Sequence, residues 1–166
     1  MANCCWFEMK AVSDKREPLE RLLKIMKYED DEYFIYRTWV CDDGDSISEA
    51  PDGSGLLEVR YYGDVAWGPS PWVSDPEDLS NNSKTGAHYA NLQAICKALN
   101  ISVEVWAQED GMGFQEHIYV DRHGNYTLDS RDISFKGSED DPEVVGGFDE
   151  YNEFEDASEM WRCADE

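Results

Sequence analysis

Alternating apolar and polar residues at the start of the chain predict a β-strand. In residues 4–12, apolar side chains such as Phe7 and Met9 alternate with Glu8 and Lys10, so the strand has one dry and one wet face. Three further segments are rich in aromatic and β-branched residues and are also expected to be strands: 33–41, 56–67 and 101–108. The second and third strands are expected to form a hairpin with a long connection.

Two other segments carry apolar residues at steps of three and four, the period of an amphipathic helix. Ser13 or Asp14 can cap the first, which begins just before Pro18 because proline is tolerated in a first helical turn. The second covers residues 85–100 and ends at Asn100. Their apolar stripes are Leu19, Leu22, Leu23 and Met26, and Tyr89, Leu92, Ile95, Cys96 and Leu99.

A β-hairpin is expected after the fourth strand, with its turn at His-Gly-Asn, residues 123–125, and its second arm extended by residues 131–137. The order β-α-β-β-α-β is that of the ferredoxin-like fold. Each apolar face finds a partner when both helices cover one side of the sheet. We therefore predict an α+β protein with a ferredoxin-like antiparallel sheet, two helices on one face and an added C-terminal β-hairpin.

The end of the chain is strongly acidic. Residues 139–166 contain twelve acids and one base, Arg162. Aromatic residues interrupt this run, and a short helix with one aromatic face would be formed by Phe148, Tyr151 and Phe154. We therefore divide the chain into a ferredoxin-like domain, residues 1–138, and an acidic C-terminal extension, residues 139–166.

The formal net charge of the 166 residues is −23, which changes the expected partners. Such a charge disfavours direct contact with nucleic acids or anionic membranes, and no segment has the ~20 apolar residues of a membrane helix. Basic proteins are the natural partners, and solubility alone is the other interpretation. Five cysteines without a C-x-x-C pair and the lack of a signal-like apolar run indicate a reducing, cytoplasmic location.

Three blocks resemble, in order, the YubB-type ferredoxin-like family: MANCCWFEMKAV, VAWGPSPW and VEVWAQEDGMGFQEHIYVDRHGNY. Ser70 separates the paired prolines of the family's Trp-x-Pro-Pro loop, and Cys4 stands at the place of an aromatic residue. The resemblance implies a ferredoxin-like fold and carriage by plasmids, phages and their hosts. The family has no established activity, so no catalytic residue is implied. The positions that match its structural motifs are Trp67, Pro69, Pro71, Gly111, Gly113 and Phe114.

Residues 109–117 carry the rival interpretation, an acid-base site. Glu109 or Asp110 can pair with Glu116 or His117, since catalytic groups need only converge in space. Exposed acids beside a Gly-Met-Gly turn are the commoner case. Cys4 and Cys41 lie in expected strands and Cys96 lies on an apolar helix stripe, which favours core positions, and the histidines match no zinc pattern. Neither a metal nor a cofactor is therefore expected.

We expect a non-enzymatic acidic binding protein that engages a basic partner, such as a nucleic-acid-binding host protein. It would mimic nucleic acid or act as an anti-restriction or anti-CRISPR-like factor, with the tail aromatics as anchors. The alternatives are a small metal-dependent or acid-base enzyme using residues 109–117, and a housekeeping module whose acidity serves solubility. The expected partner-binding residues are Asp42, Asp43, Asp45, Glu49, Glu139, Asp140, Asp141, Glu143, Asp149, Glu150, Glu153, Glu155, Asp156 and Glu159.

Overall fold

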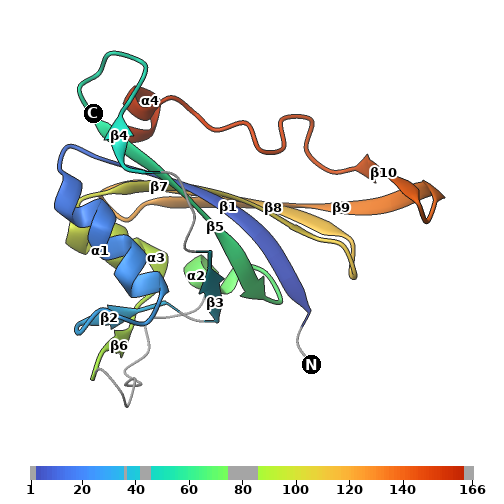
Figure 1. Ribbon diagram of the computed structural model, residues 1–166, viewed down its shortest axis with the longest axis horizontal. Helices are drawn as coiled ribbons and strands as arrows, with labels where there is room; N and C mark the ends of the chain where they lie inside the picture. Colours follow the sequence, from blue (N-terminus) through green and yellow to red (C-terminus); the bar gives the residue numbers. More distant parts are fainter. Residues whose placement is uncertain (1–2, 36, 42–45, 75–85, 163–166) are drawn as a thin grey trace.

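The computed structural model describes residues 3–35, 37–41, 46–74 and 86–162. In this part of the chain an eight-stranded sheet forms one layer, and helices α1 (Arg16–Met26) and α3 (Leu92–Leu99) cover one of its faces (Figure 1). Two shorter helices, α2 (Pro71–Ser74) and α4 (Ala157–Trp161), lie at the ends of loops. The predicted α+β class with a large antiparallel sheet is confirmed.

The order of strands across the sheet is β10-β9-β8-β7-β1-β5-β3, and β4 also pairs with β5. All of these pairs are antiparallel. The strands are β1 (Cys4–Ser13), β3 (Thr38–Val40), β4 (Ser48–Glu49), β5 (Leu57–Ala66), β7 (Ser102–Glu109), β8 (Phe114–Val120), β9 (Tyr126–Ser138) and β10 (Asp141–Gly146). A separate parallel pair consists of β2 (Tyr33–Phe34) and β6 (His88–Tyr89).

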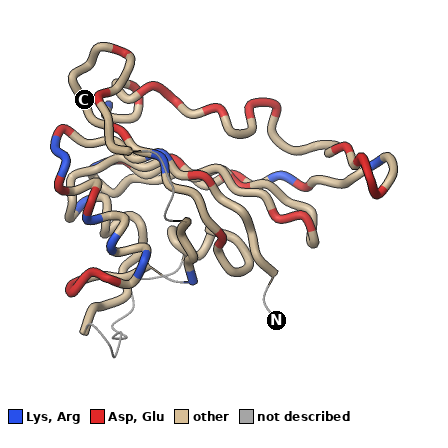
Figure 2. Tube along the Cα trace, in the orientation of Figure 1, with Lys and Arg blue, Asp and Glu red and all other residues tan. Residues whose placement is uncertain are grey.

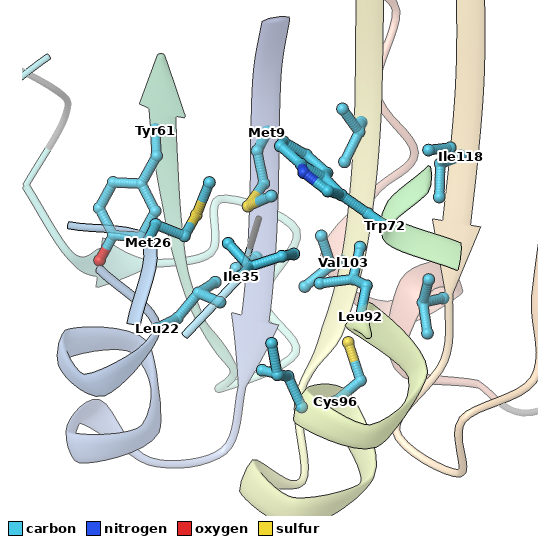
Figure 3. Packing of buried hydrophobic residues seen from close by; sticks show 14 of the residues in the cluster. Met9, Leu22, Met26, Ile35, Tyr61, Trp72, Leu92, Cys96, Val103 and Ile118 are labelled. Carbon is cyan, nitrogen blue, oxygen red and sulfur yellow. The ribbon is translucent and has the colours of Figure 1, made fainter. Parts of the chain in front are cut away.

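The core lies between the two helices and the sheet. Successive strand residues point to opposite faces, so Met9 and Tyr61, which are directly paired, both face the helices. Figure 3 shows Leu22 and Met26 of α1 and Leu92 of α3 pointing towards this face. The expected helix stripes are therefore core residues, except that Leu23 is only partly buried.

The single strand expected over residues 33–41 is wrong. Arg37 has a left-handed φ of 59°, which interrupts the extended backbone. Thr38 is then held against the end of α1, because its hydroxyl donates to the carbonyl of Met26 at 2.6 Å and its backbone N–H to the Tyr28 hydroxyl at 3.1 Å. The segment therefore divides into β2 and β3, which belong to different sheets.

The second helix is shorter than predicted. It begins at Leu92, because the Asn91 side chain accepts a hydrogen bond from the backbone N–H of Ala94 at 2.9 Å and caps the helix. Tyr89 is buried as expected, but it lies in β6 and not in the helix. Asn100 ends the helix in a left-handed conformation, as predicted.

The hairpin of β8 and β9 is confirmed, and its second arm runs on to Ser138. The carboxylate of Asp121 fixes its turn by accepting from the backbone N–H groups of His123 and Asn125. A further strand, β10, was not expected. The aromatic helix proposed near Phe148 is wrong, because the only helical turn in the described part of the acidic tail is α4.

Gly63 on β5 allows β3 to approach the sheet. A Cβ at this position would collide with the carbonyl oxygen of Trp39 and lie 2.9 Å from the Cα of Val40. Gly63→Ala is therefore expected to separate β3 from β5 and to lower the free energy of unfolding by about 1–3 kcal/mol, measured by urea unfolding. Asp64→Ala, which removes atoms from the next position, is the control. Equal stability of Gly63→Ala and wild type would contradict the close approach.

Candidate functional site

After β10 the chain returns across the face of the sheet that α1 and α3 do not cover (Figure 1). We call this face the open face and residues 147–161 the strap. On the open face, Lys10, Glu104 and Tyr119 lie in one cross-strand row, and Trp106 and His117 lie in the next. These five side chains form the floor on which the strap rests.

Hydrogen bonds from this floor hold the backbone of the strap. The indole Nε1 of Trp106 donates to the carbonyl of Glu153 at 3.1 Å, and the Lys10 ammonium donates to the carbonyl of Glu155 at 2.6 Å. The Glu104 carboxylate accepts from the backbone N–H of Glu155 at 2.8 Å and contacts His117 Nε2 at 2.6 Å. Polar groups of the sheet thus replace water for a stretch that has no regular secondary structure.

The aromatic side chains of the strap face the sheet. The rings of Phe148 and Tyr151 pack edge-on against Trp106, with centroids 5.2 and 5.7 Å away. Phe154 lies under the guanidinium of Arg60, 4.9 Å from its ring centroid. At the end of the strap, Met160 is fully buried. The tail aromatics therefore anchor the tail to its own sheet.

The carboxylates of the strap point the other way. All six of its acids are exposed, and Glu159 pairs with Arg162 at 3.6 Å. Among the described residues, the remaining five side chains have neither a cation nor a hydrogen-bond donor as a partner. These five are Asp149, Glu150, Glu153, Glu155 and Asp156. Figure 2 shows the acids following the strap and the β9–β10 end of the sheet.

The other predicted partner-binding acids that the structure describes lie at the two ends of the strap. Exposed acids gather where β9 turns into β10, namely Glu139, Asp140, Asp141 and Glu143, the last 3.7 Å from Lys136. Glu49 is exposed on β4, and its neighbour Ala50 packs with Ala157 and Met160 of the strap. Asp42, Asp43 and Asp45 lie outside the described residues.

Residues 109–117 are divided between the two faces of the sheet. Glu109 is buried, and its carboxylate accepts from the backbone N–H groups of Gly111 and Met112. Glu116 is also buried, on the helix side of the sheet. Burial raises the pKa of this carboxyl to about 7, although a hydrogen bond with the Ser70 side chain acts in the opposite direction and lowers it. His117 points to the open face. The predicted pair of Glu109 and His117 is therefore not formed, because the two side chains lie on opposite faces of the sheet, whereas Glu109 and Glu116 share the helix side.

The cysteine nearest to this region is a poor nucleophile. Cys5 is fully buried, and burial together with the charge of Glu116 raises the pKa of its thiol well above the ordinary value. Cys96 is also a free, buried thiol, as expected, but the core positions expected for Cys4 and Cys41 are wrong, because both of these free thiols are exposed. No three His, Cys, Asp or Glu side chains among the described residues are placed to hold a metal ion.

The positions taken from the family resemblance surround the turn after β7. Gly113 has a φ of +79°, and its carbonyl accepts from the backbone N–H of Ile133 on β9 at 2.8 Å. Gly111 does not adopt a positive φ. Phe114 packs against the core as expected. In the facing loop, Trp67 is 47% exposed with a φ of 69°, Pro69 is buried, and Pro71 opens α2.

A groove of about 520 Å³ opens beside the end of the strap. Its walls include Glu104, His117 and Tyr119 of the sheet and Glu155 and Met160 of the strap. Since its carboxylates outnumber its cations, it can accept cationic groups of a partner next to the strap.

Within the described residues, no helix is long and apolar enough to cross a membrane.

No model of a known protein family matches this chain, and no curated protein or solved structure shows significant similarity to it. The site is therefore defined by its own geometry.

The anchors of the strap were not identified from the sequence. Lys10 was assigned only to the wet face of its strand, and Glu104 and Trp106 only to the fourth strand. One signal was available. Two neighbouring strands, β1 and β7, each carry large or charged residues at alternate positions of the same face, which indicates that another segment with polar groups covers this face.

Proposed function

We propose that this protein is a non-enzymatic acidic binding protein that engages a basic protein partner, such as a nucleic-acid-binding host protein. One observation carries this proposal: the strap holds five carboxylates outward without intramolecular partners, while its aromatic residues and backbone are bound to the sheet. Ionised carboxylates accept strong hydrogen bonds from arginine and lysine. Holding them in an ordered segment reduces the entropy lost on binding.

The charge distribution also favours rapid association. A strongly negative surface steers a basic partner and raises the association rate by about 10- to 1,000-fold at low salt. Two cations of the sheet lie over aromatic rings of the strap: Arg60 over Phe154, and Arg131 over Phe148. The outer surface of the strap is therefore dominated by carboxylates, as the phosphate backbone dominates the surface of a nucleic acid.

A finer proposal concerns the fold and its setting. The neighbours β7-β1-β5-β3, with α1 following β1 and α3 following β6, support a ferredoxin-like arrangement extended by β8, β9 and β10. The resemblance to YubB-type proteins supports a plasmid or phage setting, in which the acidic strap would mimic nucleic acid and occupy a host defence protein. The free cysteines support a cytoplasmic location.

Two variants with the same loss of charge test the binding role. In the first, the strap is neutralised by Asp149→Asn, Glu150→Gln, Glu153→Gln, Glu155→Gln and Asp156→Asn. In the control, five exposed acids on and beside α1 are neutralised by Asp14→Asn, Glu17→Gln, Glu20→Gln, Glu29→Gln and Asp31→Asn. The ion pairs that the control removes are exposed and contribute little to stability.

Wild type and both variants are used as bait in pull-downs from host cells at ~0.15 M salt, and association rates with the recovered basic protein are then measured. We expect the strap variant to associate about tenfold more slowly at low salt, and the control to stay near wild type. Equal rates for the two variants would show that net charge alone, and not the strap, determines binding. No basic partner at all would favour the housekeeping interpretation.

A second candidate function is an acid-base enzyme, and Glu116 is the observation that favours it. This carboxyl is buried beside Ser70, and its pKa of about 7 suits a general acid or base near neutral pH. An ester or phosphodiester hydrolysis that is lost in Glu116→Gln and kept in the strap variant would support this candidate over binding.

A further inference from the structure

A second exposed feature of the open face lies at the edge of the sheet beyond the strap. Trp39 of β3, Asp64 of β5 and Trp6 of β1 are directly opposite one another in the strand register. Residues paired in this way project from the same face, about 5 Å apart from strand to strand. The two indoles are 59% and 41% exposed, which is unusual for the largest apolar side chain. We call these three residues the tryptophan row.

The tryptophan row is acidic as well as aromatic. Asp64 lies between the two indoles, and among the described residues its carboxylate has no cation or hydrogen-bond donor. Glu8, two residues beyond Trp6 on β1 and on the same face, is also without a partner among the described residues. The ring of Tyr62 stacks on Trp6 with centroids 6.5 Å apart and supports it from the side. The row therefore offers flat π faces on both sides of an unpaired carboxylate.

This combination matches the chemistry of arginine. A guanidinium stacks on an indole face through its planar cation, and at the same time donates hydrogen bonds to a carboxylate. Lysine shares the charge but not the planar fork, so it gains less from the same site. Phe154, which packs against Arg60 on the same face, is an intramolecular example of an aromatic ring and a guanidinium in contact.

We propose that the tryptophan row is a docking site for arginine side chains of the basic partner. This inference rests on the proposed function and specifies which side chains of the partner the protein selects. The strap supplies charge, which attracts any cationic surface. The tryptophan row supplies selectivity for arginine over lysine.

Two synthetic peptides separate these contributions: one of six Arg-Gly repeats and one of six Lys-Gly repeats, each with a fluorescent label. Their affinities for the full-length protein are measured by fluorescence anisotropy at ~0.15 M salt. We expect wild type to bind the arginine peptide about two- to fivefold more tightly than the lysine peptide. Trp39→Ser and Asp64→Asn should each remove most of this preference. Phe135→Ser, which removes a 41% exposed aromatic ring from β9, is the control and should retain it.

The failure of this inference differs from the failure of the proposed function. Equal affinity of wild type for both peptides, or an unchanged preference in Trp39→Ser, would overturn the docking role of the row and leave the strap proposal intact. The strap variant should bind both peptides more weakly and keep the preference for arginine. Because Trp39 is mostly exposed, its replacement leaves the core unchanged, and the circular dichroism spectrum of each variant confirms folding.

Discussion

Replacing Trp106 by alanine is expected to release the strap from the sheet and to lower the free energy of unfolding by about 3–5 kcal/mol. Trp106 is only 4% exposed, and its ring contacts His117, Phe148 and Tyr151. Its Nε1 also holds the carbonyl of Glu153. The substitution therefore removes the packing and the polar contact at the centre of the strap together.

Two measurements separate release of the strap from general destabilisation. Urea unfolding gives the stability change, and hydrogen exchange of residues 148–161 reports whether the strap is protected in the folded state. Trp106→Phe is the matched control, since it keeps a ring but loses the hydrogen bond to Glu153, which is worth about 1 kcal/mol. If the strap amides of Trp106→Ala stayed as protected as those of wild type, Trp106 would not be its anchor.

Release of the strap also bears on binding. A detached strap keeps all of its carboxylates but must be ordered again when a partner binds. Trp106→Ala should thus affect the dissociation rate of a complex more than the association rate, whereas neutralising the carboxylates should do the reverse.

Segments with a regular alternation of apolar and polar residues could be predicted from the sequence. The helix α1, the strands β1 and β5, and the hairpin of β8 and β9 each carry a complete period of apolar and polar residues. The division of residues 33–41 could not be predicted in this way, because it depends on the hydrogen bonds of Thr38 to the end of α1. Likewise, the start of α3 depends on a single cap, Asn91.

The candidate site was visible in part. The acids of the tail could be located directly, but the direction of its aromatic residues could not. Lys10 and Glu155, which are 145 positions apart, form the contact that turns the tail back over the sheet. The apolar and polar pattern of a short segment cannot reveal a contact between residues so far apart in the sequence. The spacing of Phe148, Tyr151 and Phe154 matched that of a helix. In the structure, however, these rings contact side chains of the sheet: the first two pack on Trp106, and the third packs on Arg60.

The stability of the protein is expected to fall between pH 4.5 and pH 8 because of Glu116. Burial raises the pKa of this carboxyl from 4.5 to about 7 in the folded state. In this pH range the folded chain therefore holds a proton that the unfolded chain has lost. Stability falls as pH rises wherever the folded state binds more protons. Ionisation of Glu116 in its buried place should cost about 3 kcal/mol, a loss that is complete once the pH exceeds the folded-state pKa.

Glu116→Gln removes this proton and should be the more stable protein at pH 8, with little difference at pH 4.5. The many surface acids of this chain also make stability depend on pH, so the informative quantity is the difference between variant and wild type in urea unfolding across this range. Glu150→Gln, which neutralises an exposed acid of the strap, is the control, and its free energy of unfolding should change with pH in parallel with that of wild type. Parallel curves for Glu116→Gln would show instead that the carboxyl titrates normally.

Ser70 provides an independent check on the cause of this shift. Its side chain hydrogen-bonds to Glu116 and favours the ionised carboxylate, which opposes the effect of burial. Ser70→Ala should therefore raise the folded-state pKa further, and the loss of stability should extend to higher pH than in wild type. A shift to lower pH would mean that the loop containing Ser70 had opened and exposed Glu116 to water. The direction of the shift thus distinguishes loss of one hydrogen bond from loss of the cover over the carboxyl.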